Sequence, residues 1–222
     1  MKKILGLLGI LVCVSMFAYG CGKQTKDYVR ENMSEKTEVY FYGENEKFYV
    51  TLSSGQREDV YLMNGKSEDK VDFSLLTINF FNETFNNLID AKLYVNDEEK
   101  IVNLELNNLN STYMVDLETA FSGDEEISID YKGQKLSLQN KSKDFGVNAD
   151  KAIEIASKEL SKFIMKEKKL SSLNAECYLR VLDSRANDFE DLFWVFTVVN
   201  IKNENYSVVI STVDGSVLSK SE

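Results

Sequence analysis

From residue 37 to 143 the chain alternates short apolar runs with polar turn residues. In residues 101–106 and 112–117 the hydrophobic side chains occupy every second position, which is the period of a half-buried β-strand. The neighbouring runs are rich in β-branched and aromatic residues, and turn-forming pairs such as Lys132-Gly133 separate them. Because about seven to nine such strands follow one another, the pattern predicts an antiparallel β-sandwich.

A short motif lies inside this region. Residues 43–50 fit the pattern Gly-Glu-x-Glu-x-Phe/Trp-x-Val. This pattern resembles the opening strand pair of immunoglobulin-like domains in lipoproteins of low-GC Gram-positive bacteria. The resemblance implies that residues 37–143 form an immunoglobulin-like β-sandwich without the disulfide of that fold.

After residue 145 the hydrophobic period changes to that of a helix. Asn148 is a favourable N-cap, and Asp150 falls in the first turn, where an anion suits the helix dipole. Apolar side chains then recur along one helix face: Ala149, Ala152, Ile153, Ala156, Leu160, Phe163 and Ile164. Lysines gather at the far end, so we expect one helix over residues 149–168.

Three strand-like runs follow the expected helix, and the tight turn Asp214-Gly215 lies near the end of the chain. This order resembles the PepSY family, with matches at residues 148–156, 193–198, 206–210 and 211–218. The resemblance implies a second domain over residues 145–222, in which one helix packs on an antiparallel sheet of roughly three or four strands. Because PepSY domains occur in propeptides of thermolysin-type proteases, it also implies a role in modulating or inhibiting a protease.

The first twenty-one residues have the layout of a secretory signal. A short cationic start precedes an apolar and small-residue stretch over residues 4–17, and residues 18–20 lead directly into Cys21. A cysteine at this place resembles the lipobox of bacterial lipoproteins, which implies removal of residues 1–20 and lipidation of Cys21. We therefore expect an extracytoplasmic protein that acyl chains anchor to the cell membrane.

Two alternatives to lipidation remain open at the N-terminus. Residues 4–19 could stay in place as a membrane helix, although this run is shorter than the ~20 residues that span a bilayer comfortably. The segment could also be a plain secretory signal. Residues 22–36 are polar and lack a clear period, so the lipoprotein prediction makes residues 21–36 a tether, lipidated at its start. Fully extended, such a tether would reach roughly 50 Å.

The residue types present exclude several kinds of enzyme. The sequence has no histidine, which rules out Ser-His-Asp and Cys-His nucleophiles, the HExxH motif and histidine-ligated zinc. Cys177 lies in an apolar run, where a lone cysteine is more often a small buried hydrophobe than a nucleophile. We expect a protein that is not an enzyme and needs no cofactor.

The charge balance is acidic and disfavours nucleic acid as a partner. Loss of two lysines with the signal would change the formal net charge from −10 to about −12, whereas phosphate neutralisation needs clustered lysine or arginine. Acidic clusters at residues 97–99, 124–126 and 188–191 adjoin turn residues and lack the spacing of a calcium loop. We interpret them as solvated loops, with a weak calcium site as the alternative.

Aromatic side chains are concentrated in the first predicted strands. Tyr40 and Tyr42 would share one face of their strand, with Phe41 on the other. An outward aromatic strip would suit a partner-binding surface, although packing against a tether or a second domain is the simpler explanation.

The sequence thus predicts a membrane-anchored, non-catalytic module that binds a protein partner at the cell envelope. The alternative is a lipoprotein that captures a small molecule or a cation between its two domains. The two hypotheses differ in the ligand, and both place the protein outside the cytoplasm through Cys21.

Overall fold

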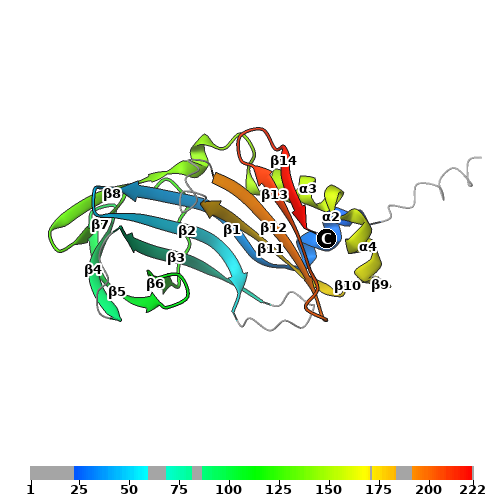
Figure 1. The fold of residues 1–222 in the computed structure, drawn as a ribbon, viewed down its shortest axis with the longest axis horizontal. Coiled ribbons are helices and arrows are strands. Elements are labelled where there is room, and N and C mark those ends of the chain that lie inside the picture. The colour runs from blue at the N-terminus through cyan, green and yellow to red at the C-terminus, as the bar shows by residue number, and fades with distance from the viewer. Residues whose placement is uncertain (1–22, 60–68, 82–86, 171, 184–191, 222) are drawn as a thin grey trace, which may run out of the picture.

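One continuous β-sheet runs through the described part of the chain (Figure 1). The computed structural model describes residues 23–59, 69–81, 87–170, 172–183 and 192–221. Within these ranges the sheet has twelve strands, and neighbours are antiparallel except for β1 (Met33–Glu44) and β11 (Ala175–Asp183). The described protein is therefore predominantly β, as the apolar alternation predicts. No helix in these ranges is long and apolar enough to cross a bilayer.

Eight of the described strands close into an antiparallel barrel. They are β1 together with β2 (Phe48–Glu58), β3 (Lys70–Phe80), β4 (Leu88–Val95), β5 (Glu98–Asn107), β6 (Thr112–Leu117), β7 (Ile127–Tyr131) and β8 (Gln134–Asn140). Their order around the barrel is β1-β2-β3-β6-β5-β4-β7-β8, and β8 pairs again with β1 at Phe41 and Tyr42. Closure lets the first and last strands satisfy each other's backbone groups.

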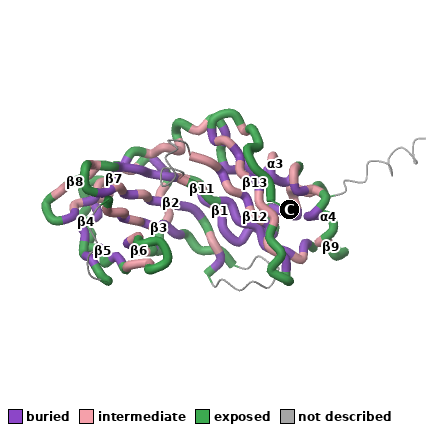
Figure 2. The backbone as a smooth tube through the Cα atoms, in the orientation of Figure 1, coloured by how far each residue is buried: buried purple, intermediate pink, exposed green. Residues whose placement is uncertain are grey.

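Alternate residues of these strands are buried (Figure 2), and their side chains form the barrel core. In β5, Val102 and Leu104 are buried in the interior, whereas Glu105 on the same strand is exposed. Aromatic rings pack in the same core, and the centroids of Phe48 and Phe80 lie 5.6 Å apart. The two-residue period thus separates a hydrophobic core from an outer face that can carry polar side chains.

Strand β1 belongs both to the barrel and to the outer part of the sheet. Its residues 33–36 pair in parallel with β11, whereas residues 41–42 pair with β8. Between these two segments, the backbone N–H of Tyr40 donates to the Oγ of Ser142 at 2.6 Å. Ser142 lies in the short 3₁₀ helix η1 (Lys141–Asp144), which follows β8. Strand β1 therefore pairs with β11 at its start and with β8 near its end.

The outer part of the molecule combines the remaining strands with helices. The strands are β12 (Leu192–Asn200), β13 (Asn205–Ser211) and β14 (Val217–Ser221), with the small hairpin β9 (Lys168–Lys169) and β10 (Ser172–Leu173). The helices are α2 (Thr25–Glu31), α3 (Ala149–Glu159) and α4 (Ser161–Glu167). They share a second core in which Ile153 of α3 and Trp194 of β12 are buried. The Trp194 indole N–H donates to the carbonyl of Val147 at 2.7 Å, so the ring's polar group is satisfied.

The immunoglobulin-like sandwich predicted for residues 37–143 is wrong. A sandwich has two separate sheets, but here β8 hydrogen-bonds to β1 and closes one sheet on itself. The period of buried and exposed positions is the same in both folds, because it reports on each strand and not on its neighbour. The closing pair, Phe41 with Asn140, joins positions far apart in sequence and leaves no local signal.

The independent helix-on-sheet domain predicted for residues 145–222 is also wrong. Strands β11 to β14 have no separate sheet, because β11 joins β1 in parallel and continues the barrel sheet outward. Its helices are not alone either, since α2 from the other end of the chain packs against α3 and α4. The order of a helix followed by strands in residues 145–222 resembled that of a compact domain. In the structure, however, β1 from the N-terminal part of the chain supplies the neighbouring strand of the sheet.

The single helix predicted over residues 149–168 is divided in two. Asn148 is the N-cap, as predicted, and its side-chain oxygen accepts from the backbone N–H of Lys151 at 2.9 Å. Helix α3 then ends at Glu159 and α4 begins at Ser161, with Leu160 as the cap between them. Leu160 stays buried in the second core, so the apolar stripe continues across the break.

The polar segment interpreted as a tether is folded where the structure describes it. Residues 25–31 form α2, and β1 begins at Met33. Tyr28 and Val29 are buried in the second core. Two adjacent buried residues in an otherwise polar seven-residue helix are too few to create a recognisable helical period.

Candidate functional site

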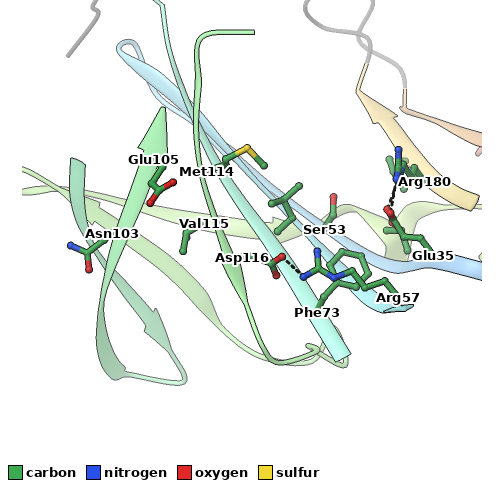
Figure 3. Close-up of a pocket in the computed structure, with 13 residues that line it drawn as sticks. Glu35, Ser53, Arg57, Phe73, Asn103, Glu105, Met114, Val115, Asp116 and Arg180 are labelled. Carbon is green, nitrogen blue, oxygen red and sulfur yellow. Dashed lines mark hydrogen bonds and ion pairs between the residues drawn. The ribbon is translucent and has the colours of Figure 1, made fainter. Parts of the chain in front are cut away.

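An open groove of about 680 Å³ lies on the outer face of the barrel, where β11 diverges from it (Figure 3). Barrel strands β1, β2, β3, β5 and β6 form most of its lining, and β11 supplies Arg180 and Val181. Strand alternation explains which side chains reach it. Leu52 of β2 is buried in the barrel core, whereas the next residue, Ser53, lines the groove. The site therefore consists of the residues that the barrel core leaves on the outside.

Apolar side chains line the middle of the groove. Leu75 and Met114 come from adjacent barrel strands. Phe73 is almost fully buried near the start of β3, directly opposite Gly55 of β2. The lining is thus a mixture of apolar surface and polar groups, which is usual for a recognition site.

One side of the groove is formed by an ion pair between β11 and β1. The Nε and Nη2 atoms of Arg180 donate to the two carboxylate oxygens of Glu35 at 2.7 and 2.6 Å. Glu35 is buried, while the Arg180 side chain is 55% exposed. The two-point geometry fixes the guanidinium plane, and the arginine also lies over the ring of Tyr178, 5.4 Å from its centroid. This pair holds a cationic, half-exposed group at a fixed position.

A second arginine, Arg57, also lines the groove, beside Phe73 and Asp116 (Figure 3). Arg57 of β2 forms an ion pair with Asp116 of β6. Its guanidinium lies 5.1 Å from the ring centroid of Phe73, so aromatic and carboxylate contacts both restrict it. Both groove arginines are therefore held in position by the fold.

The arrangement is suited to binding more than to catalysis. Glu35 and Asp116 each face an arginine in an ion pair, and arginine stays protonated at physiological pH. Planar, positioned guanidinium groups recognise carboxylates and backbone carbonyls by hydrogen bonds, and the apolar floor can take up a hydrophobic side chain.

The two acidic clusters within the described residues have structural partners. Glu99 accepts from the Tyr94 hydroxyl at 2.8 Å and pairs with Lys92, and these hydrogen bonds lower its pKa. Glu125 accepts from the backbone N–H groups of Ser122 and Gly123 at 2.9 and 2.8 Å. Burial opposes its ionisation, but those hydrogen bonds lower the pKa of Glu125. The cluster at 188–191 lies outside the described residues, and within them no group of three potential metal ligands comes together.

The structure describes one of the two cysteines discussed in the sequence analysis, Cys177, and not the other, Cys21. Cys177 is fully buried on β11, as predicted, and burial raises the pKa of its thiol far above the usual value. Such a thiol is protonated and inaccessible, which is typical of a structural residue. Cys21 lies outside the described residues, so its lipidation stays a prediction.

The aromatic residues divide between the two sides of β1 as predicted. Phe41 is part of the barrel core, whereas Tyr40 and Tyr42 point to the other side. The ring of Tyr42 lies 6.2 Å from that of Tyr49 on β2, and Phe81 extends this outer strip with a half-exposed side chain. The strip is separate from the groove.

Sequence reasoning missed the groove because its key residues are distant along the chain. Glu35 falls in the segment interpreted as a tether, and Arg180 falls in a predicted strand of a different domain. An isolated arginine in a strand is a signal only when its partner is known, and here the partner is 145 positions away.

Comparison with known proteins does not identify the chain. No family model matches the sequence, no curated protein is similar to it, and no solved structure matches its fold. A function must therefore be argued from the groove and from the residues that precede the fold.

Proposed function

We propose that this chain is an extracytoplasmic lipoprotein, attached to the cell membrane through Cys21, and that it binds a protein partner without catalysing a reaction. The layout of residues 1–21, with its resemblance to a lipobox, supports the attachment. The lack of histidine in the sequence and the buried state of Cys177 favour binding over catalysis. The binding surface is the groove beside the barrel.

The observation that carries this proposal is the composition of the open groove. Arg57 and Arg180 are each held in its lining by an ion pair, and Phe73, Leu75 and Met114 add apolar side chains to the same lining. A polypeptide segment offers carbonyl or carboxylate groups to the arginines and side chains to the apolar floor. A drug-sized ligand is usually enclosed over about 70–90% of its surface, whereas this groove is open to solvent.

Site-specific photo-crosslinking in intact cells tests the proposal. A photoreactive amino acid replaces Glu105, an exposed residue of the groove, and a matched chain carries it at Glu98, an exposed residue of the same strand that does not line the groove. We expect a discrete protein adduct from position 105 that Arg180→Ala weakens, and none from position 98. Absence of any adduct from position 105, with the protein in the membrane fraction, would overturn partner binding at the groove.

The attachment is tested separately by mass and fractionation. The wild-type chain should carry acyl chains on Cys21, and Cys21→Ser should leave the membrane fraction. If Cys21→Ser stays in the membrane at unchanged mass, the lipoprotein assignment is wrong.

A small-molecule ligand is the second candidate, because the groove lies where the barrel meets β11, close to where the sequence-based alternative places one. This candidate predicts that some compound in a thermal screen raises the melting temperature of the wild-type chain and fails to do so for Arg57→Gln. A flat screen that includes calcium would count against it.

A further inference from the structure

The end of the molecule formed by α4 and the β9–β10 hairpin is basic, although the chain as a whole is acidic. Residues 161–170 contain four lysines and one glutamate, in a protein of formal net charge −10. Lys162 and Lys166 are exposed one turn apart on α4, and Lys169 is exposed on β9. The lysines near the end of α4 complement the helix dipole, but Lys169 lies beyond the helix and needs another explanation.

Two exposed apolar side chains accompany these lysines. Met165 on α4 is 48% exposed, and Leu170 at the tip of the β9–β10 hairpin is 96% exposed. Leu170 has φ of 53°, a left-handed conformation that glycine and asparagine adopt with less strain. A leucine at this position contributes little to the fold, because its side chain is almost entirely in water. Its chemistry suits contact with something outside the molecule.

The same end is the one from which the N-terminal segment leaves the fold. The ammonium groups of Lys23 and Lys168 both lie 4.7 Å from the ring centroid of Tyr28 in α2, so the start of the described chain is beside β9. Thr25, the first residue of α2, lies only four positions after Cys21. Four extended residues reach at most about 14 Å. A lipid on Cys21 would therefore hold this end of the molecule close to the headgroups.

We propose that Lys162, Met165, Lys166, Lys169 and Leu170 form a membrane-docking surface that binds anionic lipid headgroups. The lysines supply the attraction to the negative surface, and Leu170 and Met165 enter the interface between headgroups and acyl chains. The orientation rests on the proposed attachment at Cys21, whereas the affinity for lipid does not. Docking directs the barrel away from the bilayer, because the barrel lies at the opposite end of the molecule (Figure 1).

An environment-sensitive dye tests the docking without the lipid anchor. The chain from residue 21 to 222 contains the whole described fold, and Cys21→Ser leaves the buried Cys177 as its one remaining native thiol. Leu170→Cys then carries an NBD label, which shifts to the blue in an apolar surrounding. The matched control is a label at Leu109, which is 97% exposed on the β5–β6 turn of the barrel.

We expect the label at position 170 to shift with vesicles of phosphatidylglycerol and phosphatidylcholine, and not with phosphatidylcholine alone. High salt should reverse the shift, and the label at position 109 should not respond. Each lysine near an anionic surface strengthens binding about fivefold, so K162E/K166E should weaken it by at least about tenfold. The control pair K47E/K100E, on exposed barrel lysines, should leave binding unchanged.

Three results would overturn the docking surface: no response at position 170, an equal response at position 109, or full binding by K162E/K166E. Circular dichroism of each variant confirms that the chain is folded. Failure of the proposed attachment appears elsewhere, in the mass and fractionation of the wild-type protein. The two proposals can therefore fail independently.

Discussion

The hydroxyl of Tyr40 donates a hydrogen bond to the carboxylate of Asp183, 2.9 Å away, and so joins strand β1 to the end of β11. Strand β1 pairs with β11 at residues 33–36 and with β8 at residues 41–42, and we call the point between these two pairings the fork. The Tyr40 contact lies at this fork. Because β11 forms one side of the groove, the geometry of the fork sets the position of Arg180 relative to the barrel.

Tyr40→Phe should loosen β11 without unfolding the barrel. The substitution keeps the buried ring and removes one hydrogen bond to a carboxylate, which contributes roughly 1–2 kcal/mol. We expect faster amide hydrogen exchange at the end of β11 and little change in the barrel strands. Tyr42→Phe is the control, because the Tyr42 hydroxyl bonds Glu44 within β1 itself. Equal exchange in β11 for both variants would contradict the role of the fork.

Gly55→Ala should be strongly destabilising because of close packing at the bulge in β1. A Cβ atom at Gly55 would overlap the backbone carbonyl of Lys36, which cannot move as a flexible side chain could. We expect a loss of at least about 2 kcal/mol in the free energy of unfolding, measured by urea titration. Gly133→Ala is the comparison: nothing lies within 4 Å of its Cβ position, but its φ of 81° is left-handed, so about 1 kcal/mol should be lost. A larger loss of stability for Gly133→Ala than for Gly55→Ala would show that the structure around Gly55 relaxes to accept a Cβ atom.

The parts of the fold that could be predicted are those with a local signal. The alternation in β5 correctly predicts that Val102 and Leu104 are buried, and Asn148 correctly marks a helix start. The barrel, in contrast, depends on the pairing of β8 with β1, and the groove depends on the bond from Arg180 to Glu35. Both bring together segments far apart in sequence, and neither changes the periodicity from which strands are recognised.

The carboxylate of Glu125 should make stability depend on acid pH. Hydrogen bonds from the backbone hold its pKa in the folded state below the ordinary value of 4.5. Below that value the unfolded chain therefore binds more protons, so this contribution to stability is present above about pH 4.5 and is lost as the pH falls. Glu125→Gln should be less stable at neutral pH and should lose less on acidification, whereas Glu46→Gln, on an exposed turn, should follow the wild type. Parallel pH profiles for all three chains, from urea titrations, would contradict this assignment.

The ion pair between Arg180 and Glu35 should show strong coupling in a double-mutant cycle. Arg180→Ala leaves the buried carboxylate of Glu35 without its two-point partner, which should cost about 2 kcal/mol in the free energy of unfolding. The loss is below that of a fully buried pair, because the Arg180 side chain is half exposed. Adding Glu35→Gln removes the stranded charge and should restore part of the loss, so the double variant should be more stable than Arg180→Ala alone. If the two substitutions were additive, Glu35 would be satisfied by other groups, and the position of Arg180 in the groove would not depend on it.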